Sequence, residues 1–289
     1  MATSLYDWFG KRSYAQSGED IIAWGEMVGS RSRELKNSRT SFNFSRWIPG
    51  QARNDTGDTK GFYVDVGAYH PKLLSNTYLF YKKGWRGICV DPNPEMASLF
   101  RVARPRDVFL NVGVGGARGG SSQMTDDSKA WMPDRVRHDK TGEMEYWMFE
   151  DGAANTFSAV QAKKNQEEAG RKLIGTRRIP VWTIKKILDR YVPKGQKIDL
   201  LSVDVEGMDE EALRSNDWKK YRPTMIIAED LRFDLEKWVD GKMPAGPGLA
   251  DWGPLRPGPR GGLGVVWFLM EKGYKLVAKT PYSLIFKAK

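Results

Sequence analysis

The feature that most constrains this chain is the stretch at residues 61–94, in which two short apolar segments each end on an acidic turn. The first segment, Phe62 to Val66, runs into Gly67, and a glycine at that point lets the backbone approach a ligand closely. Ser75 to Lys83 is compatible with a helix whose amino end would point unpaired N–H groups at the same ligand. The second segment ends on Asp91, which is placed to accept hydrogen bonds from ribose hydroxyls. This order of elements predicts the two halves of a nucleoside site.

The rest of the chain continues the alternation of strands and helices. We expect strands at 108–112, 145–149, 198–207 and 224–228, helices after 14–20 and at 94–102, 158–173, 183–191, 210–213 and 264–272, and a closing hairpin at 274–279 and 283–287. Ile179–Trp182 is expected to be a short edge strand, because its proline cannot donate to a ladder. The alternation indicates an α/β fold with a mostly parallel sheet covered by helices on both faces.

In such a sheet, ligands bind outside the carboxyl ends of the strands. This rule gathers a row of polar residues at one edge: Asp65, Asp91, Asn111, Asp204, Glu206, Glu229 and Asp230.

The chain is expected to form a single domain, 1–289, with three interruptions. Residues 28–60 are polar and aperiodic, which is typical of a loop insertion, with a substrate lid as the alternative. Within them, 47–57 resembles the translated product of repeat elements scattered through some bacterial genomes. Residues 115–178 are expected to be an irregular insertion or cap, and 240–263 form a Gly/Pro-rich loop.

Composition limits the partners and the compartment. The net charge is +10, but the basic residues are scattered as doublets rather than clustered, so we expect no nucleic-acid partner. Cys89 is the only cysteine, which excludes an intrachain disulfide framework or a cysteine zinc site. No apolar run approaches the roughly 20 residues of a transmembrane helix. The amino terminus lacks an apolar signal core, so a cytoplasmic location is expected.

The glycine turn also constrains the ligand. A dinucleotide fingerprint G-x-G-x-x-G is absent, because Gly67 is followed by Ala68 to Pro71. Without that glycine trio a pyrophosphate would lose its backbone cradle. The turn therefore disfavours NAD and FAD and favours a nucleoside that lacks a pyrophosphate, such as S-adenosylmethionine.

With these motifs together, the chain resembles the FkbM-type family of S-adenosylmethionine-dependent methyltransferases. The similarity covers most of the chain outside about 28–60, 115–150 and 235–263, and its motifs are Tyr14–Asp20, Phe62–Ala68, Ser75–Thr77, Gly84–Gly87, Asp91–Pro94, Ile198–Gly207 and Arg222–Pro223. The resemblance implies a Rossmann-like class I methyltransferase fold, with a seven-stranded sheet whose last strand is antiparallel. It also implies O-methylation, usually of a sugar hydroxyl in a glycan or glycosylated metabolite. The acceptor and a homo-oligomeric state are left open.

The resemblance also suggests which residues hold the cofactor. They are Asp65 and Gly67 at the methionine end, Asp91 at the ribose hydroxyls, Asn93 and Asn111 near the ribose and adenine, and Ser75 and Asn76 at the methionine carboxylate. A plain helix cap is the alternative role for Ser75.

An alcohol is a poor nucleophile at neutral pH, so a base or a metal is useful in O-methylation. The candidates for the catalytic groups are His70, Asp204 and Glu206, with a backbone-bonded loop histidine as the alternative for His70. Asp204, Glu229 and Asp230 could hold Mg²⁺ or Mn²⁺, although the acids could instead pair with Arg or Lys.

Two other functions remain as alternatives to a carbohydrate methyltransferase. One is a nicotinamide-dependent oxidoreductase, against which the missing glycine trio argues. The other is a noncatalytic binding protein that uses the basic surface. If the acceptor is a sugar, Trp252 in the Gly/Pro-rich loop could stack on its ring and make that loop an acceptor lid.

Overall fold

The computed structural model describes residues 13–27, 60–116, 142–230 and 264–289. The expected 28–60 insertion, apart from residue 60, and the 240–263 loop with Trp252 lie outside these residues, as does much of the 115–178 segment. Within the described residues, no helix is long and apolar enough to cross a membrane.

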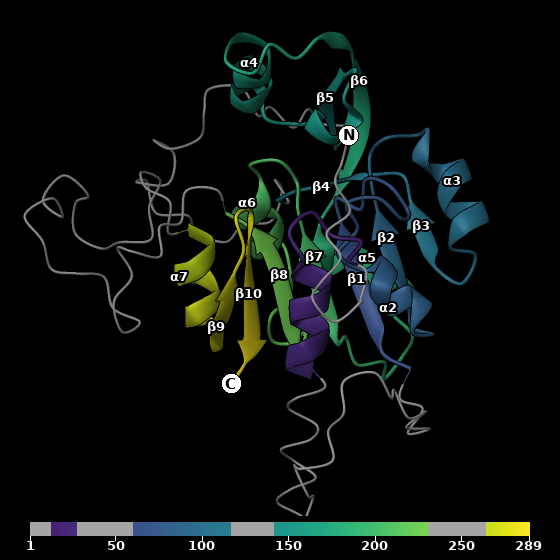
Figure 1. Ribbon diagram of the computed structural model, residues 1–289, viewed down its shortest axis with the longest axis vertical. Coiled ribbons are helices and arrows are strands. Elements are labelled where there is room, and N and C mark those ends of the chain that lie inside the picture. The colour runs from purple at the N-terminus through teal and green to yellow at the C-terminus, as the bar shows by residue number, and fades with distance from the viewer. Residues whose placement is uncertain (1–12, 28–59, 117–141, 231–263) are drawn as a thin grey trace, which may run out of the picture.

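The centre of the molecule is a seven-stranded sheet with the strand order β3-β2-β1-β7-β8-β10-β9 (Figure 1). Its strands are β1 (Phe62–Val66), β2 (Arg86–Val90), β3 (Val108–Leu110), β7 (Leu200–Val203), β8 (Met225–Glu229), β9 (Tyr274–Lys279) and β10 (Ser283–Ala288). The strands from β3 to β8 are parallel, whereas β10 runs antiparallel to both of its neighbours. This arrangement confirms the Rossmann-like methyltransferase fold with an antiparallel last strand.

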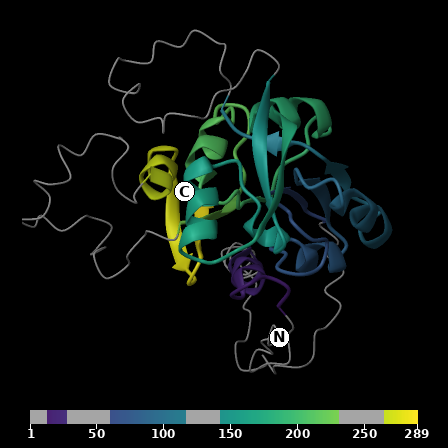
Figure 2. The same ribbon diagram turned by 90° about the horizontal axis from the view of Figure 1, so that it is seen from above.

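Both faces of the sheet are buried because its strands are apolar on successive positions. In β1, Val64 and Val66 belong to one core cluster, whereas Tyr63 belongs to the other. The first cluster packs against α5 (Ile184–Tyr191), α6 (Asp209–Arg214) and α7 (Gly264–Glu271). The second packs against helical residues 19–27, α2 (Tyr78–Lys82) and α3 (Met96–Ala103). Figure 2 views the sheet from above, with the purple helix on one side.

A small second sheet, with the order β4-β6-β5, forms a cap beyond the carboxyl ends of the main strands (Figure 1). It contains β4 (Gly113–Val114), β5 (Glu143–Phe149) and β6 (Leu173–Trp182), and its hairpin encloses the 3₁₀ turn η3 (Gly152–Ala154) and α4 (Ala159–Glu167). The described part of the segment expected to be irregular is therefore mostly regular structure.

Two expectations about the cap were wrong. The helix expected at 158–173 ends at Glu167; residues 168–172 form the connection to β6, which begins at Leu173. The strand expected at 179–182 is ten residues long and lies between β4 and β5 rather than at an edge. Pro180 is tolerated there because β4 pairs only with Val181 and Trp182, so at Pro180 the strand has a neighbour on the β5 side alone.

Candidate active site

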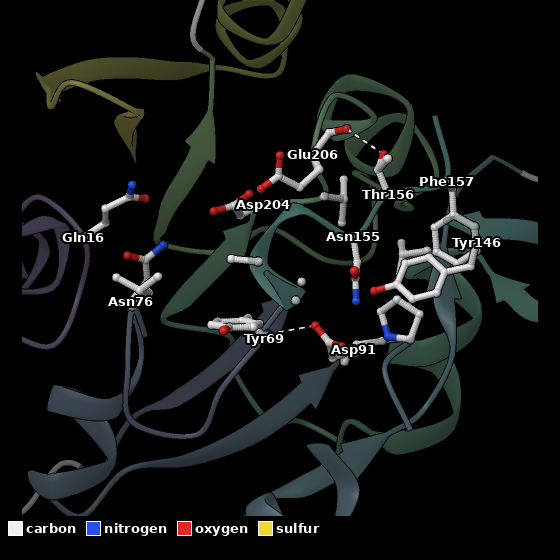
Figure 3. A pocket seen from close by; sticks show the side chains of 18 of the residues that line it. Gln16, Tyr69, Asn76, Asp91, Tyr146, Asn155, Thr156, Phe157, Asp204 and Glu206 are labelled. Atoms are coloured by element: carbon white, nitrogen blue, oxygen red, sulfur yellow. Dashed lines mark hydrogen bonds between the residues drawn. The ribbon is translucent and has the colours of Figure 1, made fainter. Parts of the chain in front are cut away.

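A pocket opens at the carboxyl ends of β1, β2 and β7, where the cap lies over the main sheet (Figure 3). The main sheet and its loops contribute Gly67, Tyr69, Leu74, Asn76, Asp91, Asp204 and Glu206, the N-terminal segment contributes Gln16 and Glu19, and the cap contributes Tyr146, Gly152, Asn155, Thr156 and Phe157. The pocket therefore lies at the edge predicted from the topology.

Gly67 allows the turn after β1 to lie directly against the end of β7. Its φ of +78° lies in the left-handed region, and a Cβ at this position would come within 1.6 Å of the Asp204 carbonyl oxygen. The backbone N–H groups of Gly67 and Ala68 both donate to the carbonyl of Val90, which ties the turn to the end of β2. Only glycine fits this close approach without moving the end of β7.

Asp91 follows β2 and lies at the base of the pocket. Its Oδ1 accepts from the N–H of Asn93 at 2.8 Å, and its Oδ2 accepts from the N–H of Tyr69 at 2.8 Å. Burial raises the pKa of Asp91 to about 7, although these two hydrogen bonds favour the charged form. Each oxygen keeps lone-pair capacity for a further donor from a ligand.

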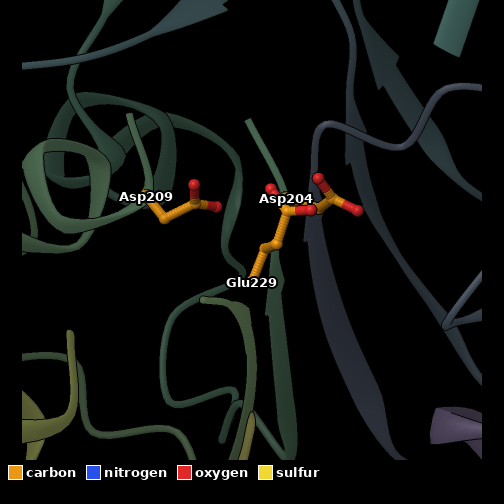
Figure 4. A group of neighbouring side chains, drawn as sticks. All are labelled: Asp204, Asp209 and Glu229. Carbon is orange, nitrogen blue, oxygen red and sulfur yellow. The ribbon is translucent and has the colours of Figure 1, made fainter. Parts of the chain in front are cut away.

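A cluster of three carboxylates adjoins the pocket, and of its members Asp204 lines it. Oxygens of Asp204, Asp209 and Glu229 lie within 4.8 Å of one another (Figure 4). Burial, followed by the charge of Asp204, raises the pKa of Glu229 to about 10, and burial also raises the pKa of Asp204 to about 6. Three carboxylates this close favour either proton sharing or a bound cation.

Glu206 lies next to this cluster, on the turn after β7. Its φ of +51° is uncommon for a residue with a side chain, and its carbonyl accepts a hydrogen bond from Thr156 of the cap at 3.1 Å. Burial and the charge of Asp204 raise the pKa of Glu206 to about 8. The turn therefore holds two weakly acidic carboxyl groups, Asp204 and Glu206, at the pocket surface.

The expected cation site differs from this cluster in one residue. Asp209, which the sequence analysis did not select, joins Asp204 and Glu229, whereas Asp230 is not among these three. Asp209 begins α6 and accepts from the N–H groups of Val205 and Gly207, so in sequence it is difficult to distinguish from an ordinary acid in the first turn of a helix.

Asp65 and Ser75 lie beneath the pocket rather than on its surface. The Asp65 carboxylate accepts a hydrogen bond from Thr77, and Thr77 also accepts from the buried Arg104 guanidinium at 2.9 Å. Ser75 Oγ accepts from the N–H of Tyr78 at 3.1 Å, as a helix cap does. These side chains support the turn that carries Asn76 into the pocket.

His70 is engaged by its own loop. Its Nδ1 accepts hydrogen bonds from the N–H groups of Lys72 and Leu73, at 3.1 and 3.0 Å. A neutral imidazole that accepts at Nδ1 carries its proton on Nε2, which leaves no ring nitrogen free to act as a base. Burial, together with Lys72, lowers the pKa of His70 and keeps it in this neutral form. The geometry therefore favours a structural role for His70 over the catalytic one.

Asn93 and Asn111 shape the turns around Asp91. Asn93 Oδ1 accepts from the N–H of Glu95 at 3.1 Å, and Asn111 Nδ2 donates to the carbonyl of Asp91 at 2.9 Å. Neither side chain is among the residues that line the pocket. Of the predicted site residues, those that line it are Gly67, Asn76, Asp91, Asp204 and Glu206.

The sequence analysis missed the cap residues altogether. Tyr146, Asn155 and Thr156 reach the pocket from a segment expected to be irregular. The alternation of acidic and apolar residues at 143–146, which predicts that Met144 and Tyr146 point inward, was the one signal available for Tyr146. Gln16 lies in a motif that the resemblance included, but no role was assigned to it.

The lining of the pocket suits a cationic ligand that has an apolar part. Four carboxyl groups line the pocket, those of Glu19, Asp91, Asp204 and Glu206, and in the described part of the chain no Lys or Arg lines it. Val112, Val114 and Phe157 supply an apolar end for a base. An anionic diphosphate would meet unfavourable charge in this pocket, whereas a cation would not.

A comparison of the chain with protein-family models gives a match. The family model described as "Methyltransferase FkbM domain" matches residues 65–252, which include Gly67, Asp91, Asp204 and the cap, whereas Gln16, Glu19 and Ser283 of the pocket lie outside the match. Neither the comparison with curated proteins nor that with solved structures gives a match.

Proposed function

Because the chain belongs to the FkbM methyltransferase family, we propose that it is an S-adenosylmethionine-dependent O-methyltransferase that methylates a sugar hydroxyl of a glycan or glycosylated metabolite. The observation that carries this proposal is the acid-lined pocket between the Gly67 turn, Asp91 and Asp204. S-adenosylmethionine carries a sulfonium and an ammonium group, both of which suit such a pocket. The diphosphate of a nicotinamide cofactor does not, which weighs against the oxidoreductase alternative.

Two ends of the pocket have distinct roles in this proposal. Asp91 accepts hydrogen bonds from the ribose hydroxyls, and Gly67 and Asn76 lie at the methionine end. S-adenosylmethionine supplies, when bound, an activated methyl group on a good leaving group. The carboxylates at the end of β7 then face the acceptor, because ligands of such sheets bind outside the carboxyl ends of the strands.

Asp204 and Glu206 are the groups we propose to act on the acceptor. A carboxylate with a raised pKa is a stronger base than an exposed one, so either could accept the proton that the hydroxyl releases as it takes the methyl group. His70 is not needed for this step. The residues would also orient the hydroxyl, which contributes to the rate independently of proton transfer.

The test is the formation of S-adenosylhomocysteine and of a methyl ether from a panel of glycosides, followed by mass spectrometry. We expect Asp204→Asn or Glu206→Gln to lower turnover more than tenfold while affinity for S-adenosylhomocysteine is retained. Glu145→Gln, on the exposed side of β5, is the matched control and should leave turnover unchanged. Wild-type turnover in both variants would remove these residues from the chemistry, and no product with any glycoside would contradict the sugar acceptor.

A divalent ion at Asp204, Asp209 and Glu229 is the proposed addition to this mechanism. Mg²⁺ or Mn²⁺ would offset two of the three carboxylate charges and could polarise the acceptor oxygen. We then expect a chelator to abolish turnover and either ion to restore it. Turnover that is unaffected by the chelator would leave the carboxylates as proton-sharing acids.

A further inference from the structure

Two cap residues face Asp91 across the pocket. Tyr146, from the inward side of β5, and Asn155, which follows the 3₁₀ turn, both line it. Figure 3 shows the Tyr146 hydroxyl, the Asn155 amide and the Asp91 carboxyl turned toward a common space. Tyr146 is only 4 % exposed, so its hydroxyl has little access to solvent.

A backbone hydrogen bond on the side away from the pocket fixes the orientation of the Asn155 amide. Its Oδ1 accepts a hydrogen bond from the N–H of Phe149 at 2.7 Å, so the NH₂ group must point the other way, toward the pocket. There it lies near the Tyr146 hydroxyl, as Figure 3 shows. The Tyr146 ring is held against Phe157, with a distance of 4.7 Å between ring centroids.

We propose that the cap forms half of the ribose site, with the Tyr146 hydroxyl and the Asn155 NH₂ group completing the hydrogen bonds that Asp91 begins. This inference rests on the proposed function, because it takes the ligand to be an adenosine derivative. It also changes the role of the cap, which would bind the cofactor as well as border the acceptor.

The chemistry of a ribose explains why a second wall is useful. The 2′ and 3′ hydroxyls present both donors and acceptors, whereas the Asp91 carboxylate can only accept. Each oxygen of Asp91 already accepts one backbone N–H, which leaves room for ribose donors but offers nothing to the ribose lone pairs. A phenol hydroxyl and an amide NH₂ are the donors that are missing from the sheet side.

Tyr146→Phe is the direct test, because it removes one oxygen and keeps the ring that packs on Phe157. Titration calorimetry of the full chain would compare S-adenosylhomocysteine with its 2′-deoxy and 3′-deoxy analogues. We expect Tyr146→Phe to weaken the parent ligand about 3- to 10-fold, as for the loss of one hydrogen bond, and to weaken at least one deoxy analogue much less. Tyr78→Phe, on α2 away from the pocket, should match the wild type.

A second variant separates binding from folding. Asn155→Asp keeps the oxygen that accepts from Phe149 but replaces the NH₂ donor, so it should also weaken the parent ligand; urea unfolding of this variant measures separately the cost of a second buried carboxyl near Asp91. Equal weakening of all three ligands by Tyr146→Phe, or no weakening of any of them, would overturn the proposal that the cap forms half of the ribose site. No binding of S-adenosylhomocysteine to the wild type would instead contradict the proposed function itself.

Discussion

At the scale of single residues, Asp91 connects burial to ligand recognition. It is 6 % exposed, and the cost of holding a charge there raises its pKa to about 7. In the proposed function the ribose hydroxyls donate to its carboxylate, so the charged form is the one that binds. Its protonation should therefore compete with the ligand in the neutral pH range.

We predict that the affinity for S-adenosylhomocysteine is greatest above pH 7 and falls as the pH decreases through about 7. Since the folded pKa is raised, Asp91 is increasingly protonated and neutral below that value, and it is fully charged above it. Calorimetry between pH 6 and pH 8 measures this trend, in roughly the range set by that pKa. Asp91→Asn should bind more weakly and lose the pH dependence, and an unchanged dependence in that variant would assign the effect to another group.

Gly67 allows a second prediction at this scale, because Gly84 is a matched control. Both glycines have a positive φ, +78° and +88°, but a Cβ at Gly84 would meet nothing within 4 Å. Gly84→Ala should cost about 1–2 kcal/mol of unfolding free energy from backbone strain alone.

Gly67→Ala should cost more than Gly84→Ala, because its Cβ also collides with the Asp204 carbonyl. It should lose S-adenosylhomocysteine binding, whereas Gly84→Ala retains it. Urea unfolding and calorimetry measure the two effects. Equal stability and equal affinity in the two variants would contradict the close approach at Gly67.

At the scale of elements, a buried ion pair connects α3 to β1, β2 and α2. The Arg104 guanidinium bonds Asp107 at 2.7 Å and donates to Tyr63 and Thr77, both at 2.9 Å. Asp107 in turn accepts from the N–H of Gly87 at 2.9 Å. This network holds the turn before α2 in place on the side away from the pocket. It thereby keeps Asn76 in the pocket lining.

We predict that Arg104→Met lowers the unfolding free energy by about 3–5 kcal/mol, because Asp107 would remain buried without its partner. Arg106→Met is the control: Arg106 is exposed, donates to the carbonyl of Tyr81 and lies 3.8 Å from the centroid of the Tyr81 ring, so its loss should cost about 1 kcal/mol. Urea unfolding of both variants decides this, and similar costs would show that the buried pair contributes little.

The elements were more predictable than the residues that face the ligand. The strands, the Gly67 turn and the position of Asp91 follow from apolar runs and turn chemistry, which are local. Asp65 was expected at the ligand, but the period of a strand places it on the Tyr63 side, where it bonds Thr77. For Asn155 there was no such signal, and the alternation along β5 could indicate only that Tyr146 points inward, because the contact of both residues with the pocket depends on the way the cap folds over the main sheet.

At the scale of the whole molecule, the main sheet and the cap enclose one pocket between them. The sheet supplies Gly67 and Asp91, β7 supplies the acids, and the cap closes the apolar end with Tyr146 and Phe157. The +10 charge of the chain contrasts with this acidic interior. The net charge of the chain therefore says little about the ligand, which is recognised by the residues at the strand ends.

The most direct measurement of the central claim is titration calorimetry of the full chain with S-adenosylmethionine, S-adenosylhomocysteine and NAD. The acid-lined pocket predicts saturable binding of the first two ligands, one per chain, and no binding of NAD. The same titration with Asp91→Asn should show weakened binding of both adenosine ligands. Absence of heat with S-adenosylmethionine and S-adenosylhomocysteine, or binding of NAD in their place, would contradict the assignment of the pocket.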